Sequence, residues 1–151
     1  MSEARSQAVV DYPLPPQALR FMGEDDAKFQ SIGDLCIRML RQAMPLAAIT
    51  GILDIGCGYG RLAHALLRDG GFSGAYYGVD ILPRQIAWCQ QALSPCGPYR
   101  FSHLDVHNAR YNPSGHQRVQ DLDFSAAPKV DVVTFYSVFT HLYEEDIRSY
   151  L

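Results

Sequence analysis

The stretch LDIGCGYGRLA, residues 53–63, decides the fold. An apolar run reaches the acid Asp54, and three glycines follow at alternate positions, namely Gly56, Gly58 and Gly60. An apolar run, then glycines, then helix-forming residues is typical of a strand, a tight turn and the N-terminus of a helix. Backbone without side chains can approach a ligand closely, so the pattern predicts a nucleotide-like cofactor at the end of this strand.

Apolar runs and amphipathic segments alternate on both sides of this stretch. We expect strands at residues 48–55, 74–80, 99–106 and 130–138, and helices at residues 26–44, 60–68, 82–93 and 140–151. Strands that alternate with helices form a parallel sheet with right-handed crossovers. The predicted fold class is therefore α/β, a doubly wound, mostly parallel sheet with helices on both faces.

Chain length and composition are typical of one domain with an apolar core, since 48% of the 151 residues are hydrophobic. Residues 1–24 contain closely spaced prolines, which predict an extended arm that lies over the domain. Residues 25–151 form the domain proper, and a long polar insert at residues 107–129 interrupts its rhythm of strands and helices.

Charge and cysteine usage exclude several classes of protein. The 13 basic residues are outnumbered by 16 acidic ones and are scattered singly, so we expect that the chain does not bind the backbone of a nucleic acid. No run is apolar for long enough to span a membrane, and no secretory signal is recognised. The four cysteines form no CxxC pair, which predicts reduced thiols in a cytoplasmic protein and no metal site (Cys36, Cys57, Cys89 and Cys96).

The spacing of the glycines distinguishes between cofactors. A dinucleotide fingerprint requires a glycine where Arg61 stands, whereas here the pattern is D-x-G-x-G-x-G across residues 54–60. This stretch resembles the first motif of class I S-adenosylmethionine-dependent methyltransferases. Three further stretches resemble later motifs of that Rossmann-like family, in order, and each is expected at a strand end: YYGVD at 76–80, SHLDV at 102–106 and KVDVVTFYSVFTHL at 129–142.

The resemblance implies a set of residues that bind S-adenosylmethionine. Asp80 would hold the ribose hydroxyls and Asp105 would hold the adenine. Asp54 would face the methionine ammonium, directly or through water. The remaining implied binding residues are Gly56, Cys57, Gly58 and Gly60 in the turn, Ile81 after the second strand, Val106 at the adenine, and Tyr136 and Ser137 at the methionine end.

Catalysis implies fewer specific residues, because methyl transfer mainly requires alignment and removal of a proton. His141 is a candidate general base, with packing against the sheet as its alternative role. Arg20 is interpreted as a solvated surface residue, with the cofactor's carboxylate as an alternative partner. The predicted acceptor is a small molecule. Two other functions stay open, a catalytically idle S-adenosylmethionine-binding module and an NAD-dependent oxidoreductase.

The resembling family has seven strands, whereas this sequence supplies four. We therefore expect that the C-terminal strands are missing and that the chain is a truncated form. The fourth strand would then be an edge rich in valine and aromatic residues, which is a template for pairing. A homodimer through this edge is the expected partner arrangement.

Overall fold

The sheet has four parallel strands. The structure, a computed structural model, describes residues 11–20, 25–122, 128–136, 138 and 148. The strand order is β3-β2-β1-β4, with bounds β1 (Gly51–Ile55), β2 (Ala75–Asp80), β3 (Tyr99–His103) and β4 (Val132–Thr134). The order reverses at β1, which places the glycine turn at the point where ligands bind in such sheets. The predicted α/β class and parallel sheet are confirmed.

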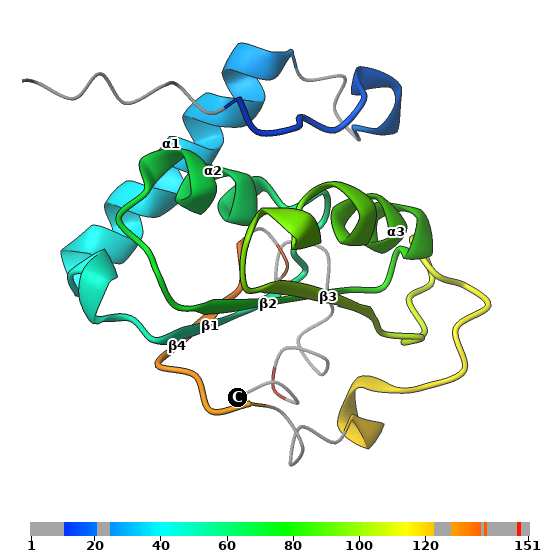
Figure 1. Cartoon of the computed structure of the whole chain (residues 1–151). Helices are drawn as coiled ribbons and strands as arrows, with labels where there is room; N and C mark the ends of the chain where they lie inside the picture. Colours follow the sequence, from blue (N-terminus) through cyan, green and yellow to red (C-terminus); the bar gives the residue numbers. More distant parts are fainter. Residues whose placement is uncertain (1–10, 21–24, 123–127, 137, 139–147, 149–151) are drawn as a thin grey trace, which may run out of the picture.

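Three α-helices cover one face of the sheet, as Figure 1 shows. They are α1 (Asp26–Ala43), α2 (Arg61–Asp69) and α3 (Pro83–Ala92). Asp25 caps α1, because its side chain accepts a hydrogen bond from the backbone N–H of Lys28 at 2.7 Å. The helix expected at residues 140–151 lies outside the described residues except for residue 148, so helical cover of the second face stays a prediction.

Short 3-10 helices connect the main elements. They are η1 (Gln17–Leu19), η2 (Leu46–Ala48), η3 (Ser94–Cys96) and η4 (Val119–Asp121). The strand expected at 48–55 begins only at Gly51, because η2 occupies the preceding residues. No helix in the described part of the chain is both long and apolar enough to cross a bilayer.

Aromatic rings fill the space between the sheet and the helices. Register places Tyr76 of β2 beside Tyr99 of β3, and their rings stack with centroids 5.3 Å apart. Gly78 lies beside Phe101, and a Cβ at Gly78 would approach the Phe101 ring to 2.7 Å. The absence of a side chain at Gly78 therefore lets the aromatic cluster close over the strands.

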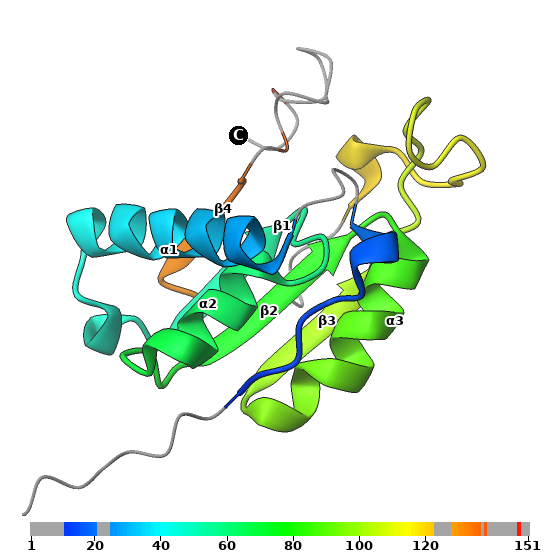
Figure 2. The ribbon, with the colours of Figure 1, turned by 90° about the horizontal axis from the view of Figure 1, so that it is seen from above.

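The N-terminal segment crosses the helix layer between α2 and α3 (Figure 2). Pro15 is fully buried there, and the carbonyl of Tyr12 contacts Nε2 of His64 on α2 at 3.3 Å. Arg20 is only 8% exposed, and its guanidinium donates to Pro15 O at 2.6 Å and to Asp26 at 2.5 Å. The expectation of a solvated Arg20 was wrong, because these acceptors satisfy its charge inside the fold.

Gly60 and Gly70 offer a matched test of packing at the two ends of α2. Both have a positive φ, 70° and 69°, so alanine is strained at either position, at a cost of about 1–2 kcal/mol. A Cβ at Gly60 would lie 2.5 Å from Leu93, whereas a Cβ at Gly70 meets nothing within 4 Å. We expect Gly60→Ala to lower the free energy of unfolding by about 1–3 kcal/mol more than Gly70→Ala. Urea denaturation measures the difference, and equal losses would contradict the packing argument.

Candidate functional site

The glycine turn after β1 is held against the end of β2. The backbone N–H groups of Gly56 and Cys57 both donate to the carbonyl of Val79, at 2.8 and 3.1 Å. The N–H of Gly58 donates to Oδ2 of Asp80 at 2.8 Å. The structure therefore brings the turn and the acid at the end of β2 into direct contact.

The three glycines of the turn are required for different reasons. All have positive φ, at 75°, 54° and 70° for Gly56, Gly58 and Gly60. A Cβ at Gly56 would overlap Val138, and one at Gly60 would overlap Leu93. At Gly58 a Cβ would meet only Oε1 of Gln85, at an ordinary 3.7 Å. The protein itself leaves the space beside Gly58 free of close contacts, as a ligand-binding turn requires.

Asp80 closes β2 with a carboxylate that faces the turn. Its second oxygen, Oδ1, accepts a hydrogen bond from the N–H of Leu82 at 3.0 Å. Burial raises the pKa of Asp80 above its ordinary value, while the N–H donors of Gly58 and Leu82 oppose the rise. Each carboxylate oxygen has a further lone pair, so Asp80 can still accept a bond from a ligand hydroxyl.

Asp54 lies beneath the turn and is only 3% exposed. Thr134 of β4 donates to Oδ1 at 2.7 Å, and the hydroxyl of Tyr76 on β2 donates to Oδ2. Burial raises the pKa of Asp54 to about 6, although both hydroxyl donors act in the opposite direction. The carboxylate thus connects three adjacent strands, and its implied contact with an ammonium stays a prediction.

Asp105 and Val106 follow β3 at the next position along the edge of the sheet. The Asp105 carboxylate accepts a hydrogen bond from Nδ1 of His116 at 2.7 Å, and Asn112 donates to it at 3.4 Å. The bond with His116 lowers the pKa of Asp105 below its ordinary value. Val106 is 3% exposed. Asp105 is thus hydrogen-bonded to two residues of the insert at 107–129. Its contact with an adenine stays a prediction.

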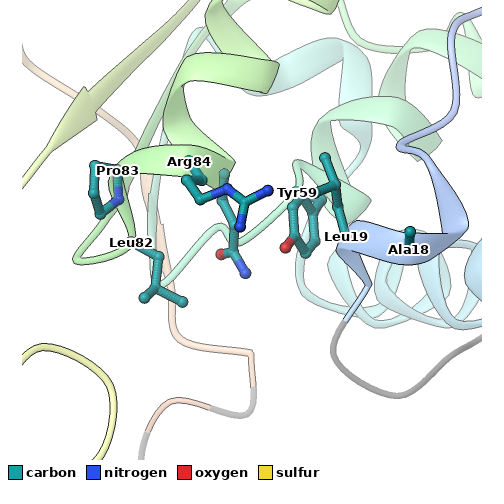
Figure 3. A pocket seen from close by; sticks show the side chains of 7 residues that line it. Ala18, Leu19, Tyr59, Leu82, Pro83 and Arg84 are labelled. Carbon is teal, nitrogen blue, oxygen red and sulfur yellow. The ribbon is translucent and has the colours of Figure 1, made fainter.

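A cavity of about 230 Å³ opens beside the turn (Figure 3). Tyr59 of the turn and Leu82 after β2 line it, and Ala18 and Leu19 of η1 close it from the N-terminal segment. The first turn of α3 supplies the remaining lining residues, Pro83, Arg84 and Gln85. Ligand pockets commonly measure about 300–1,000 Å³, so this cavity accommodates one part of a nucleotide-sized ligand.

Of the other implied site residues, the structure describes two and leaves two outside the described part of the chain. Tyr136 lies two residues beyond β4, and its hydroxyl donates to the carbonyl of Cys36 on α1 at 3.2 Å. The carbonyl of Ile81 contacts Nε2 of His103 at 3.1 Å. Ser137 and His141 lie outside the described residues, so their roles remain predictions.

Sequence reasoning missed Tyr76, Thr134 and Gln85. Tyr76 and Thr134 follow Asp54 by 22 and 80 positions, and no local pattern links residues so far apart. Gln85 stands in an amphipathic helix, where a single glutamine is unremarkable. Burial of a glutamine near a helix N-terminus would have been the useful signal, and it requires the fold.

Buried thiols adjoin the turn without forming a reactive centre. Cys57 is 6% exposed, and burial raises the pKa of its thiol well above the ordinary value, which disfavours the nucleophilic thiolate.

Among the described residues no three His, Cys, Asp or Glu side chains are grouped closely enough to hold a metal ion.

Comparison with known families identifies the chain. The family described as "Methyltransferase domain" matches residues 52–151, which include the glycine turn and every strand. The chain belongs to this family. Members of this family are class I methyltransferases with a Rossmann-like fold, and S-adenosylmethionine is their cofactor. The resemblance of the four motifs is therefore confirmed at the level of the family.

Solved structures of similar fold cover only part of the chain and are longer than it. An O-MT fragment of StiE is 22% identical over 66% of this chain, with a TM-score of 0.45. The N-terminal domain of EvdMO1, solved with SAH bound, is 18% identical over 72%, with a TM-score of 0.48. An O-methyltransferase family protein from Burkholderia thailandensis is 14% identical over 87%, with a TM-score of 0.48. The chain spans 31%, 40% and 39% of their respective lengths.

The raised pKa of Asp54 makes stability depend on pH. A carboxyl that titrates near 6 when folded and near 3.8 when unfolded stabilises the fold at low pH, and this contribution is lost as the pH rises through 6. We expect the free energy of unfolding to fall between about pH 4 and pH 7 by about 2 kcal/mol more in the unmodified chain than in Asp54→Asn.

Urea denaturation at each pH measures this difference. The comparison with Asp54→Asn cancels the opposite effects of exposed carboxyls such as Asp105, whose pKa is lowered. Parallel pH profiles for the two proteins would contradict a raised pKa at Asp54.

Proposed function

We propose that this chain binds S-adenosylmethionine along the carboxyl ends of β1, β2 and β3 and contributes to methyl transfer to a small-molecule acceptor. The proposal rests on the open space at Gly58. This space adjoins the Asp80 carboxylate, because the N–H of Gly58 donates a hydrogen bond to Asp80 at 2.8 Å. A glycine with open space beside it and a partly buried acid next to it fit a ligand with a sugar diol.

The acids in and after strands β1, β2 and β3 fit the chemistry of the cofactor. S-adenosylmethionine supplies an electrophilic methyl group and carries positive charge on its sulfonium and ammonium. The buried acid Asp54 and the partly buried acid Asp80 favour such a cation electrostatically when they are ionised. Asp105 offers a carboxylate to an adenine amino group. These residues would bind the cofactor and orient it, and alignment of the reacting groups is the main requirement for methyl transfer.

The acceptor side rests on fewer observations. His141 is proposed as the group that removes a proton from the acceptor, because histidine titrates near neutral pH. The scattered positions of 13 basic residues favour a small acceptor over a nucleic acid. All four cysteines are free, which is consistent with the proposed cytoplasmic location.

Asp80 offers the sharpest test of the binding site. We expect Asp80→Asn to weaken binding of S-adenosylhomocysteine by about 1–3 kcal/mol, because the variant loses a charged acceptor for the ribose hydroxyls. Asp34→Asn is the matched control, since it removes the same charge from an exposed pair with Arg68. Isothermal titration calorimetry measures both affinities.

Equal affinities in the Asp80 and Asp34 variants would contradict this placement of the cofactor. A methyl-release assay across small acceptors then tests catalysis separately. Binding of S-adenosylhomocysteine without transfer to any acceptor would favour the idle binding module over an enzyme. Binding of NADH without S-adenosylhomocysteine would revive the oxidoreductase alternative.

We also propose that two copies of the chain pair through the edge of β4. This strand bonds to β1 on one side, and within the described residues no strand pairs with its other side. Light scattering at micromolar concentration should give the mass of two chains. A charge on an edge strand opposes pairing, so Val133→Lys should give the mass of one chain.

Met39→Lys is the control for this second test. Met39 is 50% exposed, close to the 48% of Val133, but it belongs to helix α1 and has no place in the edge strand. The control should keep the mass of two chains. A single-chain mass for the unmodified protein would overturn the proposal.

A further inference from the structure

Gln85 has an unpaired buried oxygen in the wall of the cavity. The residue lies in the first turn of α3 and is only 2% exposed. Among the described residues, Oε1 of Gln85 finds no hydrogen-bond donor. Buried acceptors are almost always paired, because losing contact with water without a replacement bond is unfavourable. An unpaired acceptor that lines a cavity indicates a ligand that supplies the donor.

The position of Gln85 identifies which part of the site it serves. Its Oε1 would lie 3.7 Å from a Cβ at Gly58, the glycine whose N–H donates to Asp80. Gln85 and Asp80 therefore both lie next to the open position at Gly58. The cavity that Gln85 lines also includes Leu82, whose N–H donates to Asp80.

We propose that Gln85 binds the ribose of the S-adenosyl cofactor, accepting a hydrogen bond at Oε1 from one ribose hydroxyl while Asp80 accepts from the other. This inference rests on the proposed cofactor site. It assigns a binding role to a residue of α3 that none of the four sequence motifs contains.

The chemistry of the donors favours the ribose over the rest of the cofactor. A sulfonium has no donor, the adenine amino group is expected at Asp105 after β3, and the ammonium is expected near Asp54 on β1. Gln85 instead adjoins the turn beside Asp80, at the end of β2. A hydroxyl both donates and accepts, so it also complements the amide if the amide plane is turned over.

The test compares two substitutions on the same helix. Gln85→Met keeps the length of the side chain and removes the amide acceptor. Gln90→Met is the control, because Nε2 of Gln90 donates to the carbonyl of Phe101 at 2.9 Å and so has a structural bond to lose. Calorimetry gives the affinity for S-adenosylhomocysteine, and thermal melting of the ligand-free chain gives stability.

Gln85→Met should change the affinity for the ligand, whereas Gln90→Met should change the stability of the chain. Gln85→Met should weaken binding of S-adenosylhomocysteine about threefold to tenfold and leave the melting temperature unchanged or higher, because a buried unpaired acceptor is removed. Gln90→Met should lower the melting temperature and keep the affinity. Unchanged affinity in Gln85→Met, or a melting temperature that falls as in Gln90→Met, would overturn the proposal.

Analogues of S-adenosylhomocysteine that lack the 2′ or the 3′ hydroxyl locate the bond. In the unmodified chain both analogues should bind more weakly than S-adenosylhomocysteine, because one lacks the hydroxyl that faces Gln85 and the other lacks the hydroxyl that faces Asp80. In Gln85→Met the analogue without the hydroxyl that faces Gln85 should lose much less affinity relative to S-adenosylhomocysteine, which is the coupling expected of two groups in contact. Equal losses for both analogues in both proteins would overturn the assignment.

Failure of this inference is distinguishable from failure of the cofactor site. If the unmodified chain binds no S-adenosylhomocysteine, the proposed function and the role of Gln85 both fall. If the unmodified chain and Gln85→Met bind it equally, only the role of Gln85 falls. Gln85→Leu repeats the test with a side chain that has no acceptor atom, should Gln85→Met not fold.

Discussion

The buried carboxylate of Asp54 is the interaction on which the carboxyl edge of this sheet depends. It accepts hydrogen bonds from Thr134 on β4 and from Tyr76 on β2, and it lies on β1 between them. A buried carboxyl without such partners would be strongly unfavourable, so the three strands must keep their register for Asp54 to be satisfied. This constraint holds the end of β1, and with it the start of the glycine turn, in one place.

The cofactor site extends the same arrangement outward. Asp80 accepts from the N–H groups of Gly58 and Leu82, so a second, partly buried acid fixes the turns after β1 and β2 relative to each other. Backbone donors hold the carboxylate in place before a ligand arrives, and such preorganisation reduces the cost of binding. The N-terminal segment completes the cavity through Ala18 and Leu19, and buried Arg20 anchors the end of that segment to Pro15 and Asp26.

Local sequence patterns predicted the helices α1, α2 and α3 and the order of the strands. The strands expected at 99–106 and 130–138 were predicted too long, since β3 ends at His103 and β4 spans Val132–Thr134. The strand at 48–55 was predicted three residues too long, because the turn of η2 shares its apolar composition. Arg20 was misjudged, since composition describes an average arginine and burial depends on acceptors that only folding assembles.

The sequence by itself determined the order of strands and helices, the glycine turn and the acids at the strand ends, because glycine spacing and apolar periodicity are local properties of the chain. Only the tertiary structure decided which polar groups meet: Tyr76 and Thr134 at Asp54, Gly58 at Asp80, and Gln85 at the cavity with an unpaired oxygen. Those contacts join residues on different strands and helices, and their geometry follows from register and packing, which no local pattern encodes.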